Sequence, residues 1–170
     1  MVSDSRNFGL LEAHILSLSV SKAFNDARKE WSLLSVEISE EFGKCPCGQQ
    51  IKEHCYIRNN ANGNKTWVGN VCINIFIQLD TGNLFEGLRR ISRNPTASAN
   101  IDVVEYAYER GCLYGENEYL FLLETARKRS LSIAQQMWRN KINRRIINQI
   151  IVKKRTDHES GRLDNNDDLV

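Results

Sequence analysis

The chain has 170 residues, of which 41% are hydrophobic and 26% are charged. At this length one core can bury about 70% of the surface that the unfolded chain exposes, so stability requires neither disulfides nor a metal. The longest mainly apolar stretch, residues 10–24, is interrupted by Glu12, His14 and Lys22, which excludes a bilayer span and the core of a signal peptide. We expect a cytoplasmic protein of one domain, or one domain with an appendage, that has no membrane partner.

The charge is unevenly distributed along the chain, although it sums to only +2. Residues 127–155 contain ten basic residues and no acidic one, whereas the remainder has 13 basic against 21 acidic residues, a net charge of −8. A basic block in an otherwise acidic chain produces a directional field, which is the usual footprint of a polyanionic partner. The alternatives are a helix whose charged face is only solvated and is balanced by the acidic residues after Asp157, or a helix that lies on a membrane surface.

The first part of the chain predicts helix followed by strand. Residues 8–29 place apolar side chains mostly three or four positions apart, which indicates one or two amphipathic helices. Residues 31–38 are apolar or β-branched at many positions and alternate in their second half, which indicates a strand. A helical segment therefore precedes the first strand.

A hairpin and a helix are predicted next. Residues 51–59 and 65–68 read as two strands, and Asn62-Gly63 between them can adopt the positive φ angles that a tight hairpin needs. Asn70 is then a suitable N-cap for a helix that carries Cys72 in its first turn and ends near residues 80–82.

The remaining pattern is helical. A short helix over residues 83–91 is followed by a linker-like stretch, and Asn100 caps a helix that stops at Gly111. Further helices are expected over residues 116–128 and from Ser130 or Ser132 to about residue 154. The predicted organisation has four parts. Residues 1–91 form a module of N-terminal helix, strand and zinc finger, and residues 92–100 form a linker. Residues 101–155 form a helical region with a basic last helix, and residues 156–170 form a disordered acidic tail.

Four of the five cysteines lie within 28 residues, in the order Cys45, Cys47, Cys55 and Cys72. In a reducing compartment such clustering favours a metal over disulfides. Zinc in structural sites takes four ligands at tetrahedral corners, and a close pair on a turn with further ligands from a hairpin and a helix start can supply them. The alternative is four buried free thiols, since cysteine is often buried as a small apolar residue.

Local backbone chemistry supports thiolates at these positions. Pro46 fixes one backbone angle between the paired cysteines, and Gly48 lets the chain turn with its amides pointing back at sulfur. Cys72 falls in the first turn of its predicted helix, where unpaired amides and the helix dipole favour an anion. By contrast, Cys112 follows the helix-stopping Gly111 and is expected only to make the apolar contact after a C-cap.

The run Cys45-Pro-Cys-Gly48, followed by Asn62-Gly-Asn64 and Val68-Gly-Asn-Val-Cys72, resembles treble-clef zinc fingers of the short kind found in bacterial and phage proteins. The resemblance covers residues 44–80 and implies a zinc knuckle, a β-hairpin and a helix whose first turn holds a ligand. The chain departs from that pattern in two ways. Its knuckle has one residue between the cysteines instead of two, and Cys72 stands alone on the helix.

The fourth ligand must then come from the hairpin, where His54 and Cys55 are adjacent and point to opposite faces of an extended strand. We favour Cys55, because its side chain shares a face with Ile57 and thiolates occupy the other three positions. His54 remains the alternative.

The basic helix offers candidate nucleic-acid contacts. Apolar residues recur at three- and four-residue spacing between residues 130 and 154 and predict a core-facing stripe, which includes Met137. Four basic residues fall largely off this stripe, and guanidinium, ammonium and amide groups on one helical surface suit phosphates and base edges. The predicted phosphate contacts, with two from the hairpin, are Arg58, Lys65, Arg139, Lys141, Arg144 and Arg145. Trp67 or Tyr56 could stack on a base, although we favour simple hairpin packing for Trp67.

The sequence therefore predicts an α+β protein in which a small zinc-bound, treble-clef-like hairpin module is flanked by an N-terminal helical segment and a C-terminal helical bundle. Its predicted function is zinc-dependent but non-enzymatic nucleic-acid binding, with DNA favoured over RNA and no small-molecule substrate. The alternative is a regulatory protein that binds another protein. An HNH-type nuclease is the third hypothesis, for which His54, Asn70 and Asn74 offer parts but no second histidine lies within reach.

Overall fold

The computed structural model describes residues 2–152, with side chains from residue 6 onward. Within these residues it is an α+β fold, with seven α-helices, one short 3₁₀ helix and a three-stranded antiparallel sheet in the order β1-β2-β3. The predicted acidic tail, residues 156–170, lies outside the described residues. Among the helices of the described part, none has both the length and the apolar composition that a membrane crossing needs.

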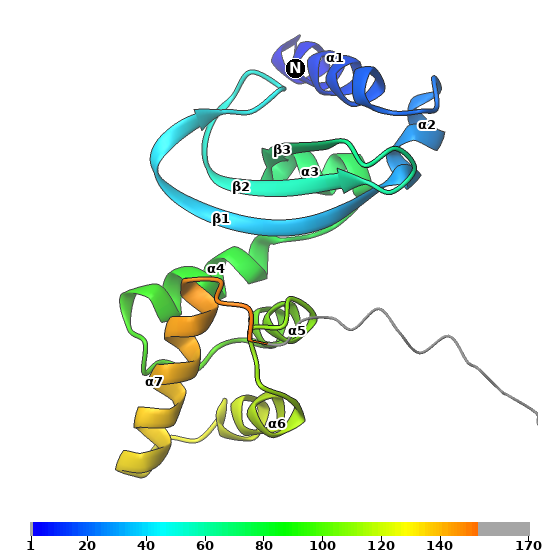
Figure 1. The fold of residues 1–170 in the computed structure, drawn as a ribbon. Coiled ribbons are helices and arrows are strands. Elements are labelled where there is room, and N and C mark those ends of the chain that lie inside the picture. The colour runs from blue at the N-terminus through cyan, green and yellow to red at the C-terminus, as the bar shows by residue number, and fades with distance from the viewer. Residues whose placement is uncertain (1, 153–170) are drawn as a thin grey trace, which may run out of the picture.

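The N-terminal helical segment forms as predicted. It comprises α1 (Val2–Leu18), α2 (Phe24–Ala27) and the 3₁₀ turn Arg28–Glu30. Leu11 and Ile15, four residues apart on α1, are completely buried. This spacing gives α1 one apolar stripe, which it packs against the sheet side of the molecule (Figure 1).

The sheet consists of β1 (Trp31–Lys44), β2 (Gln50–Asn59) and β3 (Lys65–Gly69). The predicted hairpin is present, and Gly63 has the positive φ of 79° that its turn requires. β1 is longer than expected, because it continues past an irregularity in its pairing with β2 that begins after Ile38. The extension carries the chain to the turn that holds the first two cysteines.

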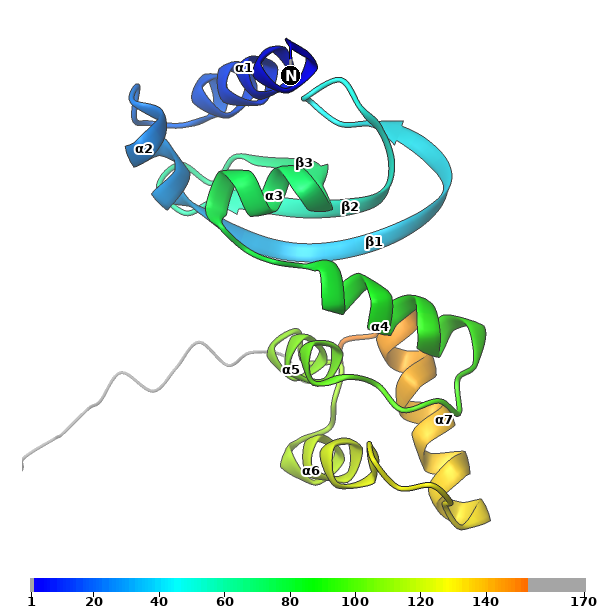
Figure 2. The ribbon, with the colours of Figure 1, turned by 180° about the vertical axis from the view of Figure 1, so that it is seen from behind.

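Helix α3 (Asn70–Ile77) follows β3 directly and lies across the β2–β3 hairpin (Figure 2). Its N-cap is Gly69, so Asn70 is one residue further along than predicted. The side-chain amide of Asn70 instead donates to the carboxylate of Glu53 on β2, and this carboxylate also pairs with Arg89. Cys72 lies in the first turn, as the sequence indicated.

The second part of the chain is helical, and two of its four helices start at a cap residue that the sequence indicated. Asn100 accepts a hydrogen bond from the Val103 amide, and Ser132 forms a capping box with Gln135. We call residues 2–81 the sheet half and residues 82–152 the helical half; the latter contains α4 (Gly82–Arg93), α5 (Ile101–Glu109), α6 (Glu116–Thr125) and α7 (Ile133–Ile147).

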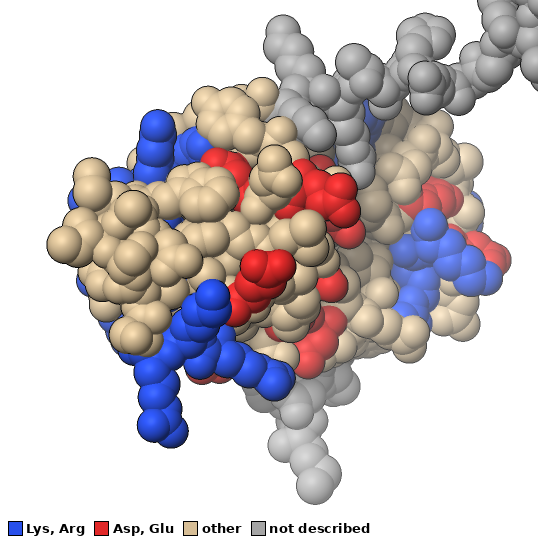
Figure 3. All heavy atoms as spheres, turned by 90° about the horizontal axis from the view of Figure 1, so that it is seen from below, with Lys and Arg blue, Asp and Glu red and all other residues tan. Residues whose placement is uncertain are grey.

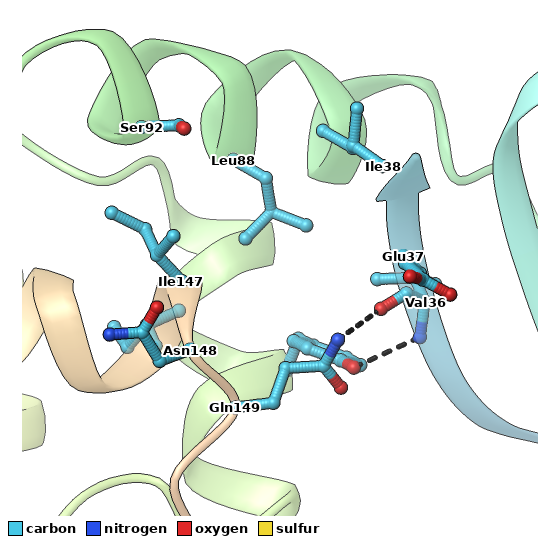
Figure 4. Close-up of a pocket in the computed structure, with 10 residues that line it drawn as sticks. Val36, Glu37, Ile38, Leu88, Ser92, Ile147, Asn148 and Gln149 are labelled. Atoms are coloured by element: carbon cyan, nitrogen blue, oxygen red, sulfur yellow. Dashed lines mark hydrogen bonds between the residues drawn. The ribbon is translucent and has the colours of Figure 1, made fainter. Parts of the chain in front are cut away.

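Side chains of the helical half bind the edge of β1 that faces away from β2. The backbone N–H of Val36 donates to the hydroxyl of Tyr106 at 3.0 Å, and its carbonyl accepts from Gln149 Nε2 at 2.6 Å (Figure 4). Arg110 also donates to the carbonyl of Leu34 at 2.6 Å. These bonds seat the helical half directly against the sheet half, beside a cavity of about 290 Å³.

The predicted linker is held in place by α7. Asn143 donates to the carbonyls of Pro95 and Ala97, at 2.8 and 2.9 Å, and Ala99 is buried. The stretch between α4 and α5 is therefore a packed connection within the helical half.

The face that α7 buries differs from the predicted apolar stripe. Met137, assigned to the core, is 69% exposed, whereas the polar residues Arg139, Asn143 and Arg145 are buried with Ile142. The predicted stripe is correct for Ile142 and Ile146, which are buried. It is wrong for Met137, and the surface placement of Arg139 and Arg145 is wrong because every charged residue was treated as a surface residue. Buried polar residues are found where partners are available, and those partners lie on other elements.

Candidate metal centre

Three buried cysteines from two elements meet at one point. Cys45 and Cys47 lie in the turn that follows β1, and Cys72 lies in the first turn of α3. Their three Sγ atoms all lie within 4.8 Å of one another, and those of Cys45 and Cys72 are 3.6 Å apart. Three thiols at this separation are within metal-binding distance and are compatible with a zinc site.

The turn that positions Cys45 and Cys47 is closed by backbone hydrogen bonds. The amide of Cys45 donates to the carbonyl of Gln49 at 2.9 Å, and the amide of Gly48 donates to the carbonyl of Cys45 at 2.7 Å. Gly48 has a φ of 95°, which favours glycine. Its amide was expected to point at sulfur and does not. The backbone amides of Cys47 and Gly69 do so, and that of Gly69 donates to Cys45 Sγ at 3.4 Å.

The hydrogen bonds around Cys45 favour a thiolate there. The hydrogen bond from Cys72, together with the amides of Cys47 and Gly69, lowers the pKa of the Cys45 thiol to about 5. The same contact raises the pKa of Cys72, because its proton is held against the Cys45 sulfur and burial opposes a second negative charge. A bound dication would remove this conflict, since it lets neighbouring thiols ionise together.

Neither candidate for the fourth ligand belongs to this group of sulfurs. Cys55 lies in the middle of the sheet, paired with Val36 and Val68, and is completely buried. Burial raises the pKa of its thiol to about 12, as for a small apolar core residue. Its side chain interacts with Thr81, which comes after the C-terminal end of α3, whereas Cys72 is at the N-terminal end of that helix. The charge of Cys45 also raises the pKa of Cys55, but the Cys55 sulfur does not join the group of three.

His54 lies on the opposite face of β2. Its ring packs 4.6 Å from the ring of Trp67, and only 8% of the residue is exposed. The side chain of Asn70 donates to Glu53, which precedes His54 on β2 and therefore points to the opposite face of the strand. Asn70 and His54, two of the parts proposed for a nuclease site, are thus not brought together. Trp67 itself is half-buried in this packing, which fits the structural role favoured for it over base stacking.

A cavity of about 540 Å³ adjoins the cysteine cluster, and all three clustered cysteines line it. Phe8 and Leu11 of α1 and Val71 and Ile75 of α3 form much of its wall. Val71 and Ile75 are 65% and 50% exposed, so the cavity opens to solvent along α3. Sequence reasoning missed this cavity because it depends on how α1 packs beside α3.

Two of the predicted phosphate contacts are buried. Arg139 is 5% exposed and donates to the carbonyl of Thr125 at 2.7 Å. Arg145 is 8% exposed and forms an ion pair with Glu118. Burial is the largest single influence on the pKa of Glu118 and would raise it, but the hydrogen bonds from Arg145 and the Tyr114 amide, together with the charge of Arg145, outweigh burial and lower the pKa. Both arginines hold helices together and are not presented to a phosphate.

The other predicted contacts are exposed but lie on different parts of the molecule. Arg58 and Lys65 sit opposite each other in the β2–β3 ladder, whereas Lys141 and Arg144 are on α7 in the helical half. Both ribbon views place the body of α7 at the bottom of the molecule, below the sheet that contains the hairpin (Figures 1 and 2). Arg58 lines a cavity of about 860 Å³ with Tyr106 and Arg110 of the helical half. On the underside of the helical half, basic residues form separate groups with acidic residues between them (Figure 3).

Comparisons with protein-family models, with curated proteins and with solved structures find no match for this chain. The resemblance to treble-clef fingers therefore rests on local order alone, and the structure contains a cysteine-bearing turn, a hairpin and a helix in that order.

Proposed function

We propose that the protein is a non-enzymatic zinc-binding protein in which Cys45, Cys47 and Cys72 hold the ion. The observation that carries this proposal is the convergence of three buried sulfurs within 4.8 Å, with the Gly69 amide directed at one of them. Zinc binds cysteine sulfur at about 2.3 Å, so two thiolates on one tetrahedral ion lie about 4 Å apart. The 3.6 Å between the sulfurs of Cys45 and Cys72 fits that separation.

The role proposed for zinc is structural. The three cysteines join the turn after β1 to the start of α3, and the hairpin lies between them in sequence. One ion would therefore fix the end of the long strand β1 against α3. In small modules such binding contributes an apparent folding free energy of about 10–16 kcal/mol.

The test is the metal content of the purified full-length protein, measured by elemental analysis. We expect about one equivalent of zinc in the parent chain and a loss of zinc in Cys72→Ser. The matched control is Cys112→Ser, which changes another buried cysteine outside the cluster and should leave the zinc content unchanged. A parent protein that binds no zinc after reconstitution under reducing conditions would refute the proposal.

Nucleic-acid binding is a second candidate function, and one observation favours it. Lys141 and Arg144 line a groove of about 410 Å³ on α7, together with Met137 and Asn140, and no acidic residue is among its described lining. The exposed residues Arg127, Lys128 and Arg129 precede this helix. With the two buried arginines excluded, we take these five exposed cations, on and just before α7, as the phosphate contacts.

The salt dependence of binding to duplex DNA tests this second function. Five phosphate contacts predict a log-log slope of about −4.5, and Lys141→Ala should reduce its magnitude by about 1. Arg93→Ala, which removes an exposed cation outside the groove, is the control. An affinity for DNA that is absent or independent of salt would exclude nucleic-acid binding. Recovery of a stoichiometric protein partner after nuclease treatment would favour the protein-binding alternative.

A further inference from the structure

We propose that the fourth coordination position of the metal is open to the cavity beside α3 and accepts a neutral nitrogen donor, such as an imidazole, from outside the chain. This inference rests on the proposed zinc site and adds to it an exchangeable ligand and its chemical class.

The first argument is the position of the sulfurs. All three clustered cysteines line the same cavity of about 540 Å³, so a metal bound to them would present its remaining position on the cavity side. Structural zinc sites are closed by a fourth protein ligand, whereas sites with three protein ligands keep one position for another molecule. Within the described residues, no fourth Cys, His, Asp or Glu joins the group.

The second argument concerns the described residues that could close the site from within the chain. Cys55 is held between Val36 and Val68 in the centre of the sheet, and His54 is packed against Trp67 on the opposite face. His14 of α1 is engaged with the hydroxyl of Thr66, 2.8 Å from its Nε2. To ligate the metal, each of these side chains would have to leave a packed position.

The third argument gives the class of ligand. Zinc with three thiolates has a net charge of −1, and the described residues that line the cavity include no Lys, Arg or His to balance a second negative charge. An anionic ligand would be disfavoured there, because an uncompensated charge in a partly apolar site is costly. Imidazole nitrogen is neutral and is a common zinc ligand beside three cysteines. The walls formed by Phe8, Val71 and Ile75 suit its flat apolar ring.

The test uses cobalt(II) in place of zinc in the full-length protein, because its visible bands report the ligand set. We expect a thiolate-to-cobalt charge-transfer absorption whose intensity corresponds to three thiolate ligands. Titration with imidazole should then shift the visible bands in a saturable way. Cobalt that does not bind at all would refute the zinc site itself. Cobalt that binds with bands unaffected by imidazole would overturn this inference alone.

Variants separate the remaining outcomes. Cys55→Ala should leave the cobalt spectrum unchanged, and loss of one sulfur's absorption would overturn the inference by making Cys55 the fourth ligand. His158 lies outside the described residues and is tested separately. If imidazole shifted the bands only in His158→Ala, the fourth position would belong to His158, and the inference would be overturned. Ile75→Trp, which narrows the cavity, should weaken imidazole binding several-fold without loss of metal. Ile101→Trp, at an equally exposed isoleucine on α5, is the matched control.

Discussion

The two halves of the molecule bury chemically different groups. In the helical half, buried polar side chains bind partners that the chain supplies: Arg145 pairs with Glu118, and Asn143 binds two carbonyls of the connection between α4 and α5. In the sheet half, the clustered thiols have mainly one another and backbone amides as partners. The buried polar side chains of the helical half thus find most of their partners within the chain, whereas the cysteine cluster of the sheet half is where we propose that an ion binds.

The largest expected effect is that of metal removal, and it should fall on the sheet half. Withdrawing the ion with a chelator should expose amides of β2, β3 and α3 to hydrogen exchange, because up to about 10–16 kcal/mol of apparent folding energy is lost there. Amides of α5, α6 and α7 should keep their protection. Mass-spectrometric exchange with and without chelator measures this, and equal loss in both halves would contradict the comparison.

The next effect concerns the buried ion pair of the helical half. Arg145→Met should destabilise the protein by about 3–5 kcal/mol, because it leaves the carboxylate of Glu118 buried without its partner. Arg144→Met, at the exposed neighbour, should change stability by less than about 0.5 kcal/mol. Urea unfolding of the metal-loaded protein compares the two. Equal effects of the two substitutions would mean that the ion pair does not hold the helices together. Partial recovery of stability in the double variant Arg145→Met with Glu118→Leu would support the predicted cost of an unpaired carboxylate.

A smaller effect is expected where α4 and α5 approach each other closely. A Cβ added at Gly87 would lie 2.6 Å from Cγ2 of Val103 and would also overlap the Asn100 side chain that caps α5. Gly87→Ala should therefore cost about 1–3 kcal/mol in the same unfolding experiment. Gly9→Ala is the control, since no atom lies within 4 Å of a Cβ there, and it should be neutral or stabilising. If both substitutions stabilised the protein, the close approach would be absent in solution.

The smallest effect is a pH dependence that arises at Glu30 in the sheet half. Hydrogen bonds from Ser21 and Asn59 lower the pKa of this carboxyl from 4.5 to about 2. A lowered folded-state pKa stabilises the fold above pH 4.5, and this contribution is lost as the pH falls towards about 2. Unfolding midpoints across this range should decline less in Glu30→Gln than in the parent chain. Identical declines would show that Glu30 contributes nothing.

Local signals in the sequence identified most elements of the fold. Turn and cap chemistry acts over a few residues, so Asn62-Gly63, Asn100 and Ser132 marked a hairpin and two helix starts that the structure contains. The cysteine pattern likewise indicated the cluster, since Cys45, Cys47 and Cys72 occur at the turn and helix start that bring their sulfurs together.

Features that depend on distant partners could not be identified in this way. The buried face of α7 is set by the carbonyls of Thr125, Pro95 and Ala97, which no periodicity within the helix reveals. Strand alternation correctly placed His54 and Cys55 on opposite faces of β2, but it did not give their distance from the cysteine turn. That distance depends on the register of β2 and on the path of β1 beyond Ile38.

The contacts of Tyr106, Arg110 and Gln149 with β1 have a consequence for association between molecules. An edge strand with free backbone groups is a template for pairing with a strand of another chain, which leads to aggregation. Here the side chains occupy the amide and carbonyl of Val36 and the carbonyl of Leu34. The helical half thereby shields the middle of β1 from intermolecular sheet growth.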